Sequence, residues 1–547
     1  MKTFRSALLA LALATLSCGS PAETPVAPAG TTHADLVTFF ADWRGFAAPP
    51  VTNGVPDYSK AAMTTQHQAL PAWQARLASF DTTGWSVPER VDWHLVQAEM
   101  NGLDFDHRVL RPWENNPAYY VQLWTAQSDT PDHEGPTPWG VIEAWTYEYP
   151  LSAEAAAELA AKFAAIPAFL ETAKTNLTGN QKDLWYMGVK ALDGQRGDLE
   201  RYGQRVAGTS ADLDAAVAAA AQASADLRDW LDSQYASKTG LSGVGRENYD
   251  WYLKNVHLSP YSLDDEILLH RRELARSYTA LKLEENRNRN LEPLPIISTA
   301  EDWDRIKGQA VTDYVAFMDR EEIVTVKDYF DPALREQLGR FNENGPTSFF
   351  AHVDYRNSYA MRTHGNHWID LQRLAIEPHP SPIRQVPQLY NIWDSRSEGL
   401  STAWEEWMLH AGLFDETPRA RELIWVLVAQ RAARGISGLM MHANEWSLAE
   451  AVEYAAEWTP YGWLAADGEL VWFEQHLYLQ QPGYGSSYLA GKAQIEEMLS
   501  QRQHQLGETF TMKGFVDQMN ASALIPVSLL QWEMTGDDAA VRAVLHD

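Results

Sequence analysis

Two histidines and an acid in residues 361–370 are the side chains best suited to metal chemistry. His364, His367 and Asp370 follow one another at intervals of three residues. If this stretch forms one helix, the three side chains project from the same face. Two imidazoles and a carboxylate, with an open position for water, commonly hold a hydrolytic zinc ion. The spacing predicts a metal site. The alternative is a buried polar network in which the imidazoles bond to nearby carboxylates or carbonyl groups.

A second acidic segment, residues 397–406, would supply the third ligand. Ser397 is expected to cap a helix that runs to about Ala411, and Glu398 would lie in its first turn. An acid in that turn can also simply complement the helix dipole. Gly399 would let a second helix or a substrate approach closely. The predicted zinc ligands are therefore His364, His367 and Glu398.

The general base is missing from its usual place. In a HExxH helix the histidines are four residues apart and the glutamate between them is the base. Here Gly365 follows His364. Glu405, Glu406 or Asp370 would then accept the proton, and we predict Glu405. Asp370 can instead be a ligand, since metals other than zinc accept two histidines and one carboxylate.

One other sequence feature resembles a peptidase signature. His133-Glu134 is the single His-Glu pair, but Pro136 and Pro138 follow it and Thr137 stands where the second histidine would be. The segment is predicted to be a surface loop and not a metal-binding helix.

Two further residues are candidates for contact with the substrate. His442 precedes a new helix that begins near Ser447, so its position alone favours a hydrogen-bonded residue at a helix junction. Tyr488 follows a glycine-rich turn that leads into a helix, where backbone N–H groups and the phenol could stabilise an oxyanion.

Composition excludes one class of partner. The formal net charge is −29, which repels phosphate backbones and anionic lipid headgroups. Nucleic acid is not an expected partner, whereas 22 Trp residues can line a wide helical core or a substrate cavity.

The N-terminus is typical of an exported lipoprotein. Lys2 and Arg5 precede a short apolar run, and the boundary 15–19 resembles a lipobox with Cys18 as the acylated residue; a plain signal peptide is the alternative. We expect a signal segment over 1–18, a flexible tether over 19–31, and a location in the periplasm or at the outer membrane. The protein would touch the membrane only through this anchor. Cys18 is the one cysteine, so the mature chain cannot use a thiol as nucleophile or ligand.

The rest of the chain is predicted to be predominantly α-helical. Helical patterns start at Val87, at Ser152 and at Ser262, and the pattern from Glu422 is expected to end near Arg434. Continuous strands are scarce, and no linker divides 32–547. The simplest expectation is one large helical domain, with one lobe or with two lobes around a central cleft.

In combination, these segments resemble a bacterial family called domain of unknown function 885, which is related to gluzincin-type zinc peptidases. The resemblance covers most of the mature chain. It rests on residues that occur in this order: Trp113, Pro117–Tyr120, Tyr249–Leu253, Glu273, Ser397–Gly399, Arg431–Arg434, His442, Trp446, Gln481–Gly483, Ser487, Tyr488 and Gly491.

The resemblance implies an all-helical peptidase-like fold and a metal held by histidines of a HExxxGH segment and the glutamate of a Glu-Gly pair. Glu398 matches that glutamate, whereas His364-Gly365-Asn366-His367 departs from the first segment. By the same analogy His442 and Tyr488 would contact a substrate carbonyl or an oxyanion. Two hypotheses follow: a zinc-dependent hydrolase of peptide or amide bonds, or a helical binding protein for a peptide or other small molecule that has lost the catalytic base.

Overall fold

Helices carry almost all of the regular structure in the computed structural model, which describes residues 32–336 and 338–545. The structure is 69% helical with 2% strand, which confirms the predominantly all-α prediction. The signal segment, the tether and Cys18 lie outside the described residues.

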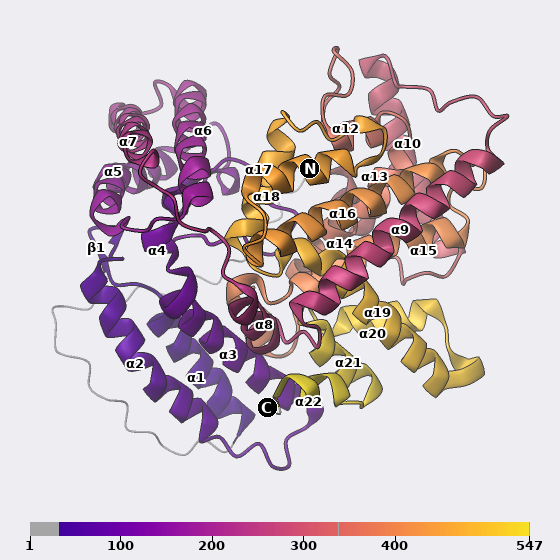
Figure 1. The fold of residues 1–547 in the computed structure, drawn as a ribbon, viewed down its shortest axis with the longest axis horizontal. Helices are drawn as coiled ribbons and strands as arrows, with labels where there is room; N and C mark the ends of the chain where they lie inside the picture. The colour runs from indigo at the N-terminus through magenta and orange to yellow at the C-terminus, as the bar shows by residue number, and fades with distance from the viewer. Residues whose placement is uncertain (1–31, 337, 546–547) are drawn as a thin grey trace.

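The first helices form a group at one end of the molecule (Figure 1, lower left). They are α1 (His33–Ala47), α2 (Lys60–Ala78) and α3 (Val87–Phe105). Ser86 and Glu89 form a capping box at the start of α3, with Pro88 in the first turn, so the helix predicted from Val87 is confirmed. The chain continues through η1, a π-helix (Asp106–Leu110), then α4 (Pro112–Asn115) and the 3₁₀ turn η2 (Pro117–Tyr120).

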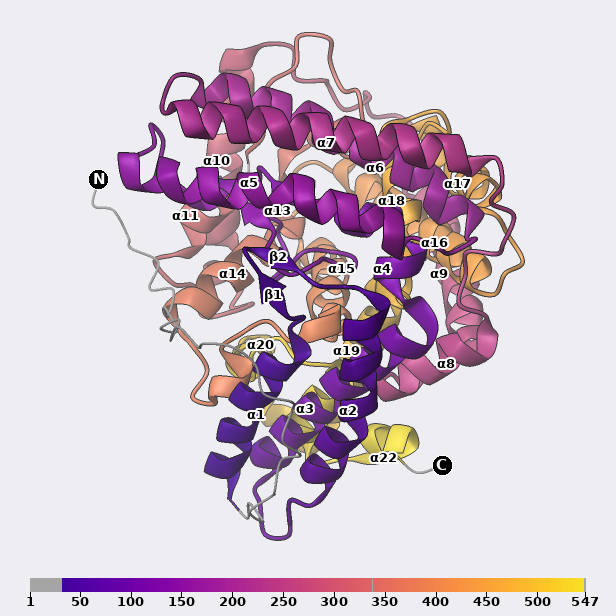
Figure 2. The ribbon, with the colours of Figure 1, turned by 90° about the vertical axis from the view of Figure 1, so that its left-hand side faces the viewer.

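Three long helices lie side by side across the top of the molecule (Figure 2). They are α5 (Ala153–Asn176), α6 (Lys182–Val206) and α7 (Ala211–Tyr235). Ser152 and Ser210 cap α5 and α7 with their side chains, so the helical start predicted at Ser152 is confirmed. Their apolar faces share one core that includes Trp185 and Phe163.

The strands are two-residue pairs near the first helices. β1 (Val51–Thr52) pairs with β2 (Val55–Pro56) in an antiparallel manner, and β3 (Leu123–Trp124) pairs with β4 (Ile142–Glu143) in parallel. The 3₁₀ turn η3 (Ala144–Thr146) follows β4. The loop between β3 and β4, residues 125–141, contributes to the candidate site described below.

The remaining helices build the larger part of the molecule (Figure 1). The first set is α8 (Arg246–Asn255), α9 (Leu263–Arg287), α10 (Ala300–Arg320), α11 (Phe330–Arg335), α12 (Phe349–Asp354), α13 (Ser358–His364) and α14 (Asn366–Ile376). The second set is α15 (Asp394–Ala411), α16 (Ala420–His442), α17 (Leu448–Glu457), α18 (Glu469–Gln480), α19 (Tyr484–Leu506), α20 (Met512–Ala521), α21 (Val527–Thr535) and α22 (Ala539–Leu545). Short 3₁₀ turns connect some of them: η4 (Pro382–Arg384), η5 (Leu389–Asn391), η6 (Pro460–Gly462) and η7 (Gly507–Thr509).

Helices α15, α16 and α19 form the buried centre that carries most candidate residues. Almost every side chain of α15 and α16 is buried, as expected for helices that are apolar or paired all round. A Cβ on Gly399 of α15 would lie 2.5 Å from the backbone carbon of Gly491 in α19. The prediction that Gly399 allows a second helix to approach is therefore confirmed.

Three local predictions near the site are wrong. Residues 361–370 do not form one helix, because α13 ends at His364 and α14 begins after Gly365, whose N–H bonds to the Arg362 carbonyl. Helix α15 begins at Asp394, so Ser397 lies inside its first turn and does not cap it. Helix α16 continues past Arg434 to His442, because neighbouring side chains pack directly on its glycines: a Cβ on Gly435 would lie 2.4 Å from the His270 ring.

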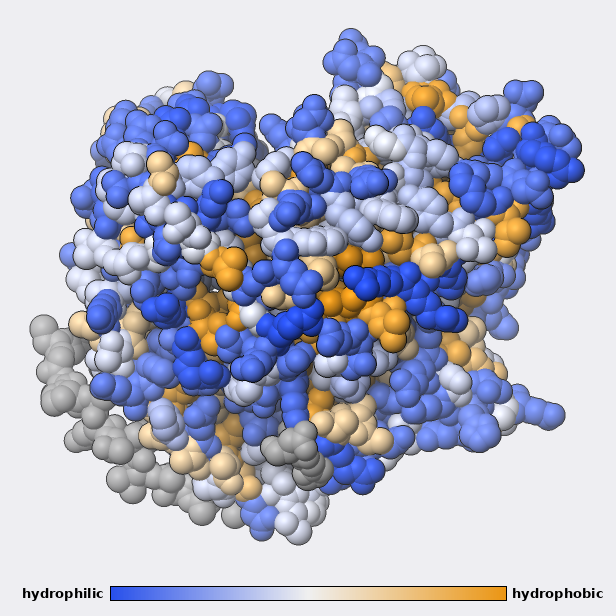
Figure 3. Space-filling model, viewed as in Figure 1, coloured by the Kyte–Doolittle hydropathy of each residue, from blue (hydrophilic) through white to orange (hydrophobic). Residues whose placement is uncertain are grey.

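The surface in the view of Figure 1 is mostly hydrophilic, with hydrophobic side chains gathered towards its middle (Figure 3). Exposed leucines of α9, Leu268 and Leu283, belong to the apolar surface of the described chain. Within the residues that the structure describes, no helix has the length and apolar character needed to cross a bilayer.

Candidate metal-binding and active site

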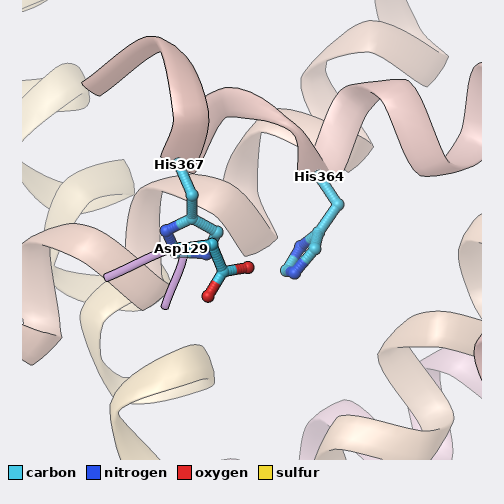
Figure 4. Close-up of side chains that lie close together, drawn as sticks. All are labelled: Asp129, His364 and His367. Atoms are coloured by element: carbon cyan, nitrogen blue, oxygen red, sulfur yellow. The ribbon is translucent and has the colours of Figure 1, made fainter. Parts of the chain in front are cut away.

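The two histidines of the predicted metal site come together, although they lie on different helices. His364 is the last residue of α13 and His367 lies in the first turn of α14, with ring centroids 5.0 Å apart. Asp129, from the loop between β3 and β4, lies beside both imidazoles (Figure 4). One ligand atom from each of the three residues lies within 4.8 Å of the other two. The two histidines therefore meet because the chain turns at Gly365, and not because they are spaced along one helix.

Glu398 of α15 lies beside His367 but is not part of the group that Asp129 forms with the two histidines. Its Oε2 lies 3.4 Å from Nε2 of His367, and Nδ1 of that ring lies 3.2 Å from Ser397 Oγ. Ligand atoms that each lie ~2.1 Å from a tetrahedral zinc are about 3.4 Å apart, so this pair has the separation of two ligands. Ser397 supplies the polar partner that a ligand imidazole needs on its other nitrogen. The donors present fit a metal ion.

The charge state of this pair follows from its burial and contacts. Burial lowers the pKa of His367, but the carboxylates of Glu398, Asp129 and Asp370 outweigh that effect and raise it to about 9. Burial would raise the pKa of Glu398, and His367, His364 and Tyr484 together hold it below its usual value. In the metal-free protein the two residues therefore form a buried ion pair.

Glu405, the predicted base, lies behind His364 and does not line the cavity that the histidines face. Its carboxylate is fully buried and accepts two hydrogen bonds of 2.7 Å from the guanidinium of Arg431. Oε1 also lies 3.3 Å from Nδ1 of His364. Burial would raise the pKa of Glu405, but Arg431 and His364 lower it below its usual value. A carboxylate in this position orients the His364 ring.

The other two acids considered as bases are also held by cations. Glu406 accepts hydrogen bonds from Arg276, at 2.7 Å and 2.8 Å, and lies 3.2 Å from Lys492. Asp370 lies 2.7 Å from Arg373 and 3.3 Å from Arg396. Neither acid lines the cavity.

The histidines and Glu398 line a cavity of about 200 Å³ between α13, α15, α16, α18 and α19. Charged groups line one part of it and apolar or aromatic side chains the rest. The apolar and aromatic lining consists of Phe350, Leu470, Phe473, Leu477, Tyr478, Tyr484 and Tyr488. Such a lining, with a few convergent polar groups, is typical of a small-molecule or substrate site.

Glu134 faces this cavity and forms no ion pair with a Lys or Arg among the described residues. Its carboxyl accepts a hydrogen bond from the hydroxyl of Tyr484, which also lies 3.0 Å from Glu398. Burial, with the nearby charges of Asp129 and Glu398, raises the pKa of Glu134 to about 8. His133 and Glu134 lie in a loop, as predicted, but the predicted surface position is wrong, because His133 is buried and Glu134 lines the cavity. The loop that carries Glu134 is held in this position by a hydrogen bond from the Gly135 N–H to the side chain of Gln481.

The two predicted substrate-contacting residues have different surroundings. Tyr488 lines the cavity, and its hydroxyl donates to that of Tyr484 at 3.3 Å. His442 is buried elsewhere, with Nε2 bonded to the Tyr478 carbonyl at 2.8 Å, and burial lowers its pKa to about 4. It does not line the cavity, in keeping with the junction residue that its position suggested.

The comparisons with known proteins decide the family. The sequence pattern of a family described as bacterial protein of unknown function (DUF885) matches residues 41–319 and 374–534. This chain belongs to the DUF885 family. The DUF885 match contains Asp129, Glu134, Glu398 and Tyr484, but it leaves out residues 320–373, which hold His364 and His367. The two histidines must therefore be argued from this chain alone.

Two solved structures share the fold. One is a candidate lipoprotein of unknown function from Shewanella oneidensis, with a TM-score of 0.67 and 14% identity over 92% of this chain and 100% of that chain. The other is a candidate lipoprotein from Colwellia psychrerythraea, with a TM-score of 0.64 and 13% identity over 94% of this chain and 99% of that chain. No functionally curated protein matches the sequence.

Sequence reasoning missed three residues of the site in this DUF885 protein. Asp129 and Glu134 lie in a proline-rich loop with no helical periodicity, far from the histidines in sequence. Tyr484 was passed over for Tyr488, one helical turn further along α19. The one available signal was the isolated His-Glu pair at 133–134.

Proposed function

We propose that the protein is an exported metal-dependent hydrolase that acts on peptide or amide bonds. The observation that carries the proposal is the 3.4 Å separation of His367 Nε2 and Glu398 Oε2, with a further imidazole and carboxylate beside them. His364, His367 and Glu398 would hold the ion, and Asp129 is placed to be a further ligand. A bound zinc would polarise the scissile carbonyl and lower the pKa of a water molecule.

Glu134 and Tyr484 are proposed to handle the proton. Glu134 lines the cavity, carries no ion pair to Lys or Arg among the described residues, and bonds to Tyr484. A carboxyl group that titrates near neutral pH can both accept and donate a proton. Tyr484 links it to Glu398, so the phenol can hold the carboxyl group in place. This assignment replaces Glu405, whose oxygens are already bonded to Arg431.

The cavity supports a substrate with an apolar or aromatic side chain. Leu477 and Tyr478 are buried in its wall, whereas Phe473 is 55% exposed. Apolar walls of this kind bind hydrophobic groups and orient the polar bond beside them. We therefore propose peptides with a large apolar residue next to the cleaved bond.

Export as a lipoprotein is part of the same proposal. The boundary at Cys18 supports it, as do the descriptions of the two structural relatives as candidate lipoproteins. The acylated chain would lie in the periplasm or at the outer membrane. Palmitate labelling of the wild type, lost in Cys18→Ser, would test this step.

The hydrolase proposal is tested with the zinc-loaded protein and a set of fluorogenic peptides. We expect cleavage that a chelator removes and zinc restores. Glu134→Gln should retain zinc but lower kcat by about 10²-fold or more, as expected for loss of a general acid or base. Asp232→Asn, a change at an exposed position of α7 that does not line the cavity, is the control and should cleave normally. Zinc binding without cleavage of any peptide would instead support the binding protein that has lost its base.

A further inference from the structure

A second cavity lies on the other side of the loop that carries Glu134. Its volume is about 140 Å³, and no residue lines both this cavity and the one at His367. The backbone of His133 and the side chain of Gln481 are tied together by Asn391, which bonds to both at 2.9 Å and 3.0 Å. The cavity is therefore a distinct site and is not an extension of the proposed active site.

Several aromatic side chains line this second cavity, beside aliphatic and polar residues. They are Tyr58, Trp113, Tyr119, Trp139, Tyr252 and Tyr390. Tyr58 stacks on Trp113 with ring centroids 6.1 Å apart and meets Tyr119 edge-on at 5.2 Å. Aromatic rings gathered around one small space can attract a cation through the negative faces of the rings.

Asp106 places a carboxylate among these rings. It lines the cavity, and within the described residues its side chain has no hydrogen bond or ion pair. Burial raises the pKa of the phenols of Tyr58, Tyr119, Tyr252 and Tyr390, and the Asp106 charge adds to the rise at each of the four. Asp106 and these four tyrosines line the same small cavity, so the carboxylate lies among their rings.

The electrostatics of the cavity favour a positive guest. Asp106 keeps some accessible surface because it faces the cavity, but loss of bulk water raises the pKa of its carboxyl to about 8. The other acid on the wall is the exposed Asp132, and the lining includes neither lysine nor arginine. An ionised carboxylate in such surroundings is unfavourable unless a cation accompanies it.

The backbone around the cavity has unusual conformations at Asp106, Tyr390 and Asn391. Asp106 begins the π-helix η1, a rare element that is frequent at functional sites. Tyr390 and Asn391 both have left-handed backbone angles, φ 62° and 50°, which non-glycine residues seldom adopt. The ring of Tyr390 lies directly on α3, because a Cβ on Gly102 would come within 2.2 Å of it.

We propose that this cavity binds a small alkylammonium cation, of the size of tetramethylammonium or choline, with Asp106 as its counter-ion and the aromatic rings as its wall. A cavity of about 150 Å³ holds a benzene-sized molecule, which limits the guest to this size. The proposal does not depend on zinc or on hydrolysis.

Calorimetric titration with choline chloride and with 3,3-dimethylbutanol, its uncharged analogue of the same shape, tests the proposal. We expect choline to bind and the uncharged alcohol to bind at least about tenfold more weakly, because it gains neither the ion pair nor the cation–π attraction. Equal binding of the two compounds, or no binding of choline, would overturn the proposal.

Variants locate the site. Asp106→Asn should weaken choline binding at least about tenfold while leaving the weak binding of the alcohol unchanged. Asp104→Asn is the matched control, since Asp104 is paired with Arg108 at 2.6 Å and does not line the cavity. Choline affinity that is unchanged in Asp106→Asn, or equally reduced in both variants, would contradict the assignment.

Discussion

Gly399 of α15 and Gly491 of α19 are in backbone contact, since a Cβ on Gly399 would lie 2.5 Å from the backbone carbon of Gly491. This contact sets the distance between the helix that carries Glu398 and the helix that carries Tyr484 and Tyr488. The cavity therefore depends on two positions that have no side chain.

Gly399→Ala should destabilise the protein because backbone atoms occupy the space of the new methyl group. Overpacking of this kind costs about 1–3 kcal/mol, and more when backbone must move. Urea unfolding measures the loss. Gly194→Ala in α6 is the control, because no atom lies within 4 Å of its Cβ and the helix should gain up to about 1 kcal/mol. Equal stability of Gly399→Ala and the wild type would contradict the contact.

Arg431→Met should destabilise the protein through Glu405. Both side chains are almost fully buried, and the change leaves the carboxylate without its main partner. Breaking a buried pair from one side costs about 3–5 kcal/mol. The double variant Arg431→Met/Glu405→Gln should recover much of that loss, as measured by chemical unfolding. A double variant no more stable than Arg431→Met would argue against a buried charge at Glu405.

Glu266→Gln should change how stability depends on pH. Glu266 is buried beside Tyr249, whose hydroxyl donates to it at 3.3 Å, and burial raises its pKa from 4.5 to about 8. The folded protein therefore holds this proton more tightly than the unfolded chain does. The stability that this proton adds to the folded protein is fully present below pH 4.5. It is lost as the pH rises to about 8, by about 1.4 kcal/mol per pH unit.

Unfolding free energies at about pH 5 and about pH 8 check this assignment. The wild type should lose more stability than Glu266→Gln over this range. Glu247→Gln, at an exposed position of α8, is the control and should follow the wild type. Parallel curves for the wild type and Glu266→Gln would rule out a raised pKa at this residue.

Much of the fold could be predicted because its signals are local. Ser262 and Ser447 form capping boxes with acids three residues later, and both helices begin where the sequence indicates. The break at Gly365 was missed because Asn366 and Trp368 continue a plausible helical pattern. Tertiary contact decides that point: a Cβ on Gly365 would lie 2.7 Å from Leu334 of α11.

The candidate site was predicted only in part, because some of its residues have local sequence signals and others are brought in by tertiary contacts. His364, His367 and Glu398 came from spacing within short segments. The two histidines meet with Asp129, and Glu398 lies beside His367 but outside that group. Glu405 was predicted as the base from its position in the same segment as Glu398, but its partner Arg431 belongs to another helix. Glu134 joins the site through a loop whose position no periodicity specifies.

Zinc stoichiometry measured on the purified protein tests the central claim most directly. The account predicts about one zinc per chain in the wild type and in His410→Ala, a change at an exposed position of α15, and loss of zinc in His367→Ala and Glu398→Gln. A wild type that takes up no zinc when it is supplied, or zinc retained in both site variants, would contradict the account.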